Sequence, residues 1–131
     1  MHDTLRTSRD PADVRRGRRW VAYHLEAERL LPPDQIDLVM TMVSELVTNV
    51  IRHTASEPEV TLRTADGWLV VEVNDGDPQL PMLDDPDDGA TGGRGLMIVA
   101  AGATEWGVEP RGTHGKTVWF RVALDPPEGA G

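Results

Sequence analysis

Hydrophobic positions along the chain repeat first with the period of a helix. From Asp10-Pro11 to about Leu30 the apolar residues follow helical spacing, and a proline in the first turn is typical of a helix start. "LPPDQ" ends this helix, and its Asp34 is a candidate cap for a second, longer amphipathic helix that ends near His53. The apolar stripe of this helix is Ile36, Val39, Met40, Val43, Val47, Val50 and Ile51. Two consecutive helices are therefore expected.

The period then changes to that of β-strands. "EVTLRTADGWLVVEVND" contains two β-rich runs joined by Ala65-Asp66-Gly67, which predicts a hairpin. Residues 76–93 are rich in proline, aspartate and glycine, so we expect a functional or disordered loop there. "GGRGLMIVAAGA" indicates a glycine-rich turn that enters a short helix. "TEWGVEP" and "KTVWFRV" predict a last pair of strands around the turn "RGTHG".

This order of elements predicts an α+β fold. We expect a two-layer α/β sandwich with a mixed, mostly antiparallel sheet covered on one face by helices. The length of 131 residues favours one domain, which we place at residues 10–124, between a flexible N-terminus (1–9) and a disordered tail (125–131). The sequence contains no cysteine, which excludes disulfides and thiolate metal sites. No signal peptide or membrane span is indicated, so a cytoplasmic location is expected.

The charge of the chain narrows the class of partner. A formal net charge of −9 and a pI near 4.7 argue against direct binding of nucleic acid, which needs clustered Lys and Arg. One local exception is "RRGRR", Arg15 to Arg19, which is either a contact patch for an acidic partner or a solvated helix face. "DDPDD", Asp84 to Asp88, repels itself and is expected in a mobile loop.

The second helix carries a polar stripe opposite its apolar positions. At about 100° per residue, Asn49 lies about 40° and His53 about 80° from Glu45 around the helix axis. A solvated helix face is the common explanation of such a stripe. Asparagine is, however, a poor helix former, its amide oxygen can bind Mg²⁺, and a carboxylate can orient or deprotonate a hydroxyl or a water. On the residues alone both interpretations stay open.

Two further segments carry candidate chemistry. Asp75 ends a β-rich run before a glycine, either as part of a turn or as a carboxylate that accepts a hydrogen bond from an exocyclic amine. Gly92, Gly93 and Gly95 precede an apolar helical run. Backbone N–H groups at such a helix start can bind an anion, although a hinge without a ligand would look the same.

The order of these segments resembles the GHKL ATPase superfamily, also called the Bergerat fold. "ELVTNVIRH", "VNDGDP", "GGRGLMIV" and "GKTVWF" are similar to its N, G1, G2 and G3 boxes, and the resemblance covers residues 11–124. Within the superfamily the chain most resembles the small ATP-binding domain of the anti-sigma factor serine/threonine kinase type. This resemblance implies the Bergerat fold with ATP and Mg²⁺ as cofactors.

The resemblance also implies a role for each matching residue. Glu45 would be the catalytic general base, Asn49 would hold Mg²⁺ between the nucleotide phosphates, and Asp75 would bind the adenine amino group. The other implied nucleotide contacts are Gly92, Gly93, Gly95, Leu96 and Thr117, with Thr117 near the adenine. Asp77 departs from the family pattern, which has a glycine at this position.

The activity implied by the resemblance is phosphorylation of a serine in an anti-anti-sigma partner. A sigma factor would be the competing partner, and related domains often form homodimers. The alternative is a non-catalytic module that sequesters a sigma factor or another regulator, with or without ATP. Retention of Glu45 and Asn49 favours the kinase, whereas Asp77 favours the binding module.

Overall fold

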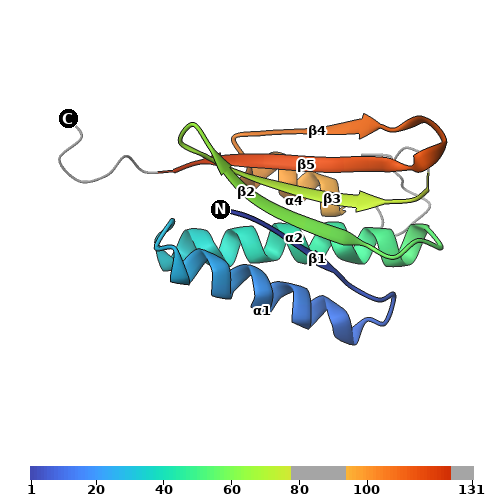
Figure 1. The fold of residues 1–131 in the computed structure, drawn as a ribbon, viewed down its shortest axis with the longest axis horizontal. Helices are drawn as coiled ribbons and strands as arrows, with labels where there is room; N and C mark the ends of the chain where they lie inside the picture. The colour runs from blue at the N-terminus through green and yellow to red at the C-terminus, as the bar shows by residue number, and fades with distance from the viewer. Residues whose placement is uncertain (78–93, 125–131) are drawn as a thin grey trace.

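The computed structural model describes residues 1–77 and 94–124. Its elements in chain order are β1 (His2–Arg6), α1 (Ala12–Ala27), α2 (Pro33–His53), β2 (Glu59–Ala65), β3 (Trp68–Asp75), α4 (Arg94–Gly102), β4 (Glu105–Pro110), the 3-10 turn η2 (Gly112–His114) and β5 (Lys116–Ala123). The strands form one sheet in the order β1-β2-β3-β5-β4. Figure 1 shows α1 and α2 side by side on one face of this sheet.

This architecture confirms the predicted α+β sandwich with one correction. Every strand pair among the described residues is antiparallel, so the sheet is not mixed. The sequence could not exclude a parallel pair, because the long segment between β3 and α4 is compatible with a crossover to either direction. The short turns at residues 66–67 and 111–115 fix two of the antiparallel pairs.

The expectation of a flexible segment over residues 1–9 is wrong for its first part, because His2–Arg6 form the edge strand β1. This strand pairs with β2 from His2 opposite Arg63 to Arg6 opposite Glu59. The Arg6 guanidinium lies 3.0 Å from the Glu59 carboxylate. Polar cross-strand pairs of this kind, rather than an apolar pattern, stabilise β1 at the edge of the sheet. Hydrophobic periodicity therefore does not predict this strand.

A proline lies at the N-cap of both α1 and α2. The Asp10 carboxylate accepts the Ala12 backbone N–H at 2.9 Å, beside Pro11, which precedes α1. Helix α2 ends at His53, as expected, but its N-cap is Pro32 and no side chain caps it. Asp34 lies in the first turn instead of at the cap. In the first turn its negative charge still interacts favourably with the helix dipole.

The hairpin between β2 and β3 turns at Asp66 and Gly67, as predicted. Both residues have positive φ, 52° and 84°, which is the signature of a type I′ turn. This turn pairs Val60 with Val73 and Leu62 with Val71. These side chains are buried, and they form one core with the apolar side of α2 and with α1.

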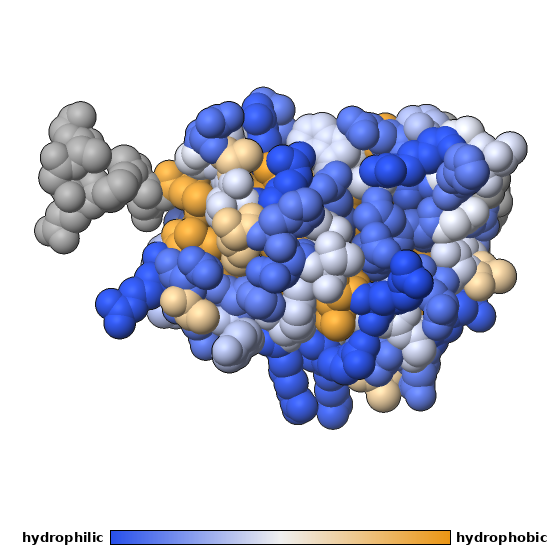
Figure 2. Space-filling view, in the orientation of Figure 1, coloured by the Kyte–Doolittle hydropathy of each residue, from blue (hydrophilic) through white to orange (hydrophobic). Residues whose placement is uncertain are grey.

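The surface is mostly polar. Figure 2 shows hydrophilic residues over most of the visible side and hydrophobic surface only in separate small patches. The arginines of "RRGRR" are exposed on α1, whereas Gly17 between them is buried. Among the described residues no helix has the length and apolar character needed to cross a membrane.

Candidate functional site

The structure brings the last turns of α2 and the segment that carries Asp75 to one end of the sheet. Helix α2 ends at this end, because β2 follows it and begins at Glu59, opposite Asn74 near the end of β3. Strand β5 begins at the same end, where Lys116 pairs with Asp75. The chain therefore brings the last turns of α2, the end of β3 and the start of β5 together.

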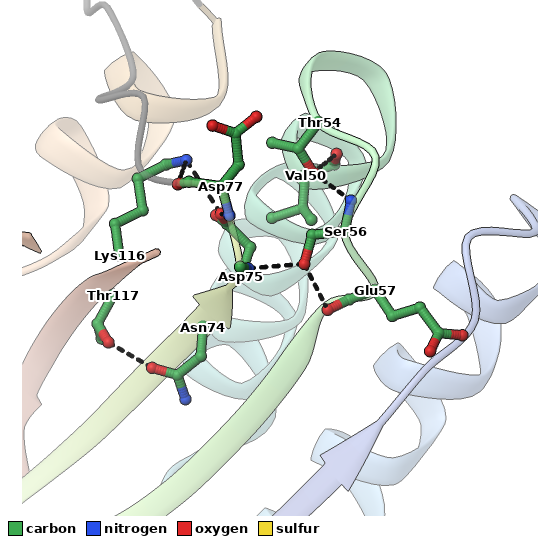
Figure 3. Close-up of polar contacts among 10 residues, drawn as sticks. Val50, Thr54, Ser56, Glu57, Asn74, Asp75, Asp77, Lys116 and Thr117 are labelled. Carbon is green, nitrogen blue, oxygen red and sulfur yellow. Dashed lines mark hydrogen bonds and ion pairs between the residues drawn. The ribbon is translucent and has the colours of Figure 1, made fainter. Parts of the chain in front are cut away.

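Asp75 is buried at this end, with its side chain 1% exposed. Its Oδ1 accepts the Asp77 backbone N–H at 2.8 Å and the Lys116 ammonium at 3.1 Å. The Lys116 ammonium also donates to the Asp77 carbonyl oxygen at 2.9 Å. Figure 3 shows Lys116 reaching over the turn toward both aspartates. A buried carboxylate needs such partners, because desolvation of an unpaired charge is costly.

The structure does not bring Thr117 to Asp75. Successive side chains of a strand point to opposite faces, and Lys116 shares the helix-covered face with Asp75. Thr117 points to the open face, the one opposite the helices, but is itself buried there. Its hydroxyl bonds to the Asn74 side chain and accepts the Arg111 Nε–H at 2.6 Å. Figure 3 shows this opposite direction. Lys116, not Thr117, is the β5 residue whose side chain lies beside Asp75.

Gly115 makes this arrangement possible. Its φ of +107° favours glycine, and a Cβ there would lie 1.9 Å from the Asp75 carbonyl oxygen. The backbone before β5 therefore passes directly against the end of β3. Glycine at this position allows the close approach that sets Lys116 beside Asp75.

A hydrogen-bond chain fixes the end of α2 to the turn after β3. The Thr54 hydroxyl donates to the Val50 carbonyl oxygen at 2.8 Å and accepts the Ser56 N–H at 3.0 Å. The Ser56 hydroxyl then accepts the Gly76 N–H at 2.7 Å. This chain, drawn in Figure 3, positions the last turns of α2 against the segment that carries Asp75.

Glu45 and Asn49 lie on one stripe of α2 together with Leu38 and Met42. At about 100° per residue these four positions span about 60° around the helix. A Cβ on Gly102, at the end of α4, would lie 3.1 Å from both the Leu38 and the Met42 side chains. Helix α4 therefore covers the first half of the stripe, and the half-buried Glu45 and Asn49 continue it toward the Asp75 end.

Helix α4 begins toward the same end. Its last residue lies against the first half of α2, near Thr104, whose N–H donates to the Arg121 carbonyl oxygen late in β5. Leu96 and Val99 are buried in the shared core, so α4 runs back over the sheet for about 12 Å. Gly95 is in its first turn. The Leu96 side chain packs in the core, and Gly92 and Gly93 lie outside the described residues.

This donor set fits a magnesium nucleotide. An amide oxygen on Asn49, a carboxylate on Glu45 and the start of a helix suit a polyphosphate and its hard cation. Among the described residues no group of three or more His, Cys, Asp or Glu could hold a metal ion. A metal here would therefore need ligand oxygens from a nucleotide besides Asn49. His53, the last residue of α2, is exposed.

Sequence reasoning missed Lys116. The continuous apolar run "VWF" that follows hides which face each residue takes. Because Val118 and Phe120 are buried in the core, alternation places Lys116 on the same face. Only the register of β5 against β3 shows that Lys116 lies beside Asp75, and the sequence of a single strand does not reveal this register.

Comparison with known proteins agrees with this geometry. A family described as "Histidine kinase-like ATPase domain" matches residues 7–122. An uncharacterized protein of Streptomyces coelicolor is 37% identical over 90 residues, which cover 65% of this chain and 85% of that protein.

Two solved structures from Erythrobacter litoralis EL346 are also similar. They are the histidine kinase domain of its blue-light activated histidine kinase (27% identity, TM-score 0.54) and that kinase itself (26%, 0.55). Each match covers 72% of this chain but only 46% and 32% of the respective solved chain, so the chain spans less than half of their length. The GHKL-type resemblance is confirmed, and membership implies ATP binding. The chain belongs to the family of histidine kinase-like ATPase domains.

Proposed function

We propose that this chain is a protein serine kinase of the anti-sigma factor type. ATP with Mg²⁺ would bind between α2, the start of α4, the end of β3 and the start of β5. The acceptor is a serine hydroxyl of an anti-anti-sigma partner, and a sigma factor competes for the same regulator. The finer assignment to this class rests on the resemblance of the four sequence boxes.

The observation that carries the proposal is the stripe of Glu45 and Asn49 on α2. Both side chains are half-buried, although a solvated helix face would leave them exposed like Asp37 and Thr41. They continue the stripe that α4 covers, on the side where Asp75 ends β3. A carboxylate and an amide one turn apart at this place suit the two tasks of base and phosphate ligand.

The chemistry follows from the demands of phosphoryl transfer, in which positioning and charge stabilisation dominate. Glu45 accepts the proton of the serine hydroxyl, the serine oxygen bonds to the γ-phosphorus, and the bond to the β,γ-bridging oxygen breaks to release ADP. Asn49 would hold Mg²⁺, which supplies positive charge to neutralise the phosphates when it is bound. The first N–H groups of α4 would donate hydrogen bonds to the phosphates, and the helix dipole would add to this attraction.

A non-catalytic binding module is the second candidate, and Asp77 is the observation that favours it. The family has glycine at this position, whereas here the Asp77 backbone bonds to both Asp75 and Lys116. The φ of Asp77 is not positive, so the turn itself does not require glycine. Asp77 thus places a carboxylate side chain, where the family has none, beside the proposed adenine site, and it does so without straining the backbone.

Calorimetry with ATP and Mg²⁺ tests the proposed nucleotide binding. Transfer of labelled phosphate to a serine-bearing partner tests the proposed kinase activity. Asn49→Ala should weaken Mg²⁺-dependent binding, because it removes a metal ligand. Glu45→Ala should keep binding and abolish transfer. Thr41→Ala, on the exposed side of α2, is the matched control and should change neither quantity.

No binding at millimolar ATP would refute the nucleotide site. Binding without transfer by the wild-type chain to any candidate partner would support the non-catalytic module. Equal loss of binding in Asn49→Ala and Glu45→Ala, at unchanged stability, would contradict the division of roles between the two residues.

A further inference from the structure

Lys116 is the only lysine of the chain and is nearly buried. Its side chain is 6% exposed and lies on the helix-covered face, opposite Asp75 in the β3–β5 register. The resemblance implied a threonine hydroxyl near the base, and the threonine at this place in the sequence points to the other face. The chain therefore offers an ammonium where a hydroxyl was expected.

A buried ion pair is weak evidence for a purely structural role. Its desolvation offsets much of its attraction, and well-packed apolar residues often stabilise a core as well or better. Val118 and Phe120 follow Lys116 on the same face, so an apolar side chain would suit the strand. The pair instead lies at the end of the sheet where α2 ends, and Glu45 and Asn49 lie on the stripe of α2 that runs toward this end.

Counting donors and acceptors shows what the pair can offer to a ligand. A lysine ammonium has three N–H donors, and the described residues supply acceptors for two of them, Asp75 Oδ1 and the Asp77 carbonyl oxygen. An ionised carboxylate has about four acceptor positions. Asp75 Oδ1 already accepts two hydrogen bonds, so its other oxygen is the natural acceptor for a ligand amine.

We infer that Lys116 is a base-reading residue of the nucleotide site. It donates a hydrogen bond to the ring nitrogen beside the exocyclic amine of adenine, while Asp75 accepts from that amine. The inference rests on the proposed nucleotide binding and adds a second reading group to it. The Asp75–Lys116 pair is complementary to an edge of the adenine ring that presents a hydrogen-bond donor and an acceptor side by side.

The first test needs no variant. Calorimetry compares the wild-type chain with Mg²⁺ and ATP, 1-deaza-ATP or 7-deaza-ATP, each analogue lacking one of the two ring nitrogens, N1 and N7, that lie on either side of the exocyclic amine. One analogue should bind at least about tenfold more weakly than ATP, because a hydrogen bond from a charged donor is lost. The other analogue should bind like ATP, and the difference identifies the nitrogen.

Lys116→Met provides the second arm, because methionine keeps the length of the side chain without its donors. This variant should bind ATP more weakly and should no longer distinguish the two analogues. Arg111→Met is the matched control, since Arg111 bonds to Thr117 on the open face and should leave the discrimination unchanged. Thermal unfolding of each variant checks that it is folded.

A spectroscopic readout separates contact with the base from a structural effect. Lysine labelled with ¹³C at Cε should give one side-chain signal, because the sequence contains a single lysine. ATP should shift this signal, and the analogue that binds weakly should shift it less at saturation.

The outcomes separate the two proposals. If the wild-type chain binds ATP and both analogues with the same affinity, the base-reading role of Lys116 is refuted while the nucleotide site stands. Unchanged discrimination in Lys116→Met refutes it too. If no nucleotide binds at all, the proposed function itself fails, and this inference fails with it.

Discussion

Gly115→Ala should destabilise the protein far more than other substitutions at glycines with positive φ. The backbone of Gly115, at φ 107° and ψ −142°, lies in a region that other residues rarely adopt. This conformation alone costs about 1–3 kcal/mol. An alanine Cβ would also lie 1.9 Å from the Asp75 carbonyl oxygen and 2.7 Å from the Gly76 Cα.

The second contribution comes from backbone that cannot rotate away. Relief of the clash requires the start of β5 to separate from the end of β3, where Lys116 pairs with Asp75. Overpacking of this kind adds about 1–3 kcal/mol. We therefore expect Gly115→Ala to lower the free energy of unfolding by about 2–6 kcal/mol, a large part of the stability of an ordinary domain.

Gly67→Ala is the matched control. Gly67 has φ 84° in the β2–β3 turn, and a Cβ there would have nothing within 4 Å. Gly67→Ala should therefore lower the free energy of unfolding only by the cost of the backbone conformation, about 1–2 kcal/mol. Urea unfolding of both variants gives the difference in unfolding free energy, to which the clash at Gly115 should be the main contribution. The reasoning fails if Gly115→Ala costs no more than Gly67→Ala.

Two other expectations concern charge. Lys116→Met should cost about 3–5 kcal/mol of unfolding free energy by leaving the buried Asp75 without its cation, and the double variant Lys116→Met/Asp75→Leu should recover much of it. Urea denaturation decides this, and a double variant no more stable than Lys116→Met would contradict it. The Ser8 backbone N–H, 2.8 Å from the Asp13 carboxylate, lowers the pKa of that carboxyl below its ordinary 3.8. A lowered pKa stabilises the fold above the ordinary value and loses this effect as pH falls through the lowered one. The Tm difference between wild type and Asp13→Asn should therefore be present at pH 7 and shrink below pH 3.8, and a constant difference would argue against it.

The site was predictable to the extent that local pattern defines it. Glu45 and Asn49 share a stripe because their spacing in α2 is one helical turn, and the helix itself follows from its apolar period. Asp75 was predictable as the end of a β-run. That Thr117 faces away from Asp75 was not predictable, because a strand read alone does not reveal which of two neighbouring side chains faces the helices.

The fold was predictable wherever apolar residues repeat. The helices α1, α2 and α4 and the strands β2 to β5 follow such repeats or turn signals. Strand β1 has one leucine and no turn signal, and it forms only because β2 presents a free edge with complementary polar side chains.

The sequence by itself determined the order of elements and the identity of the polar groups on each, because helix and strand periods are local properties of a chain. Only the tertiary structure decided which of those groups meet. The register of β5 against β3 depends on contacts between residues about 40 positions apart in the chain. That register, with the backbone contact that Gly115 allows, sets Lys116 against Asp75 and sends Thr117 to the other face.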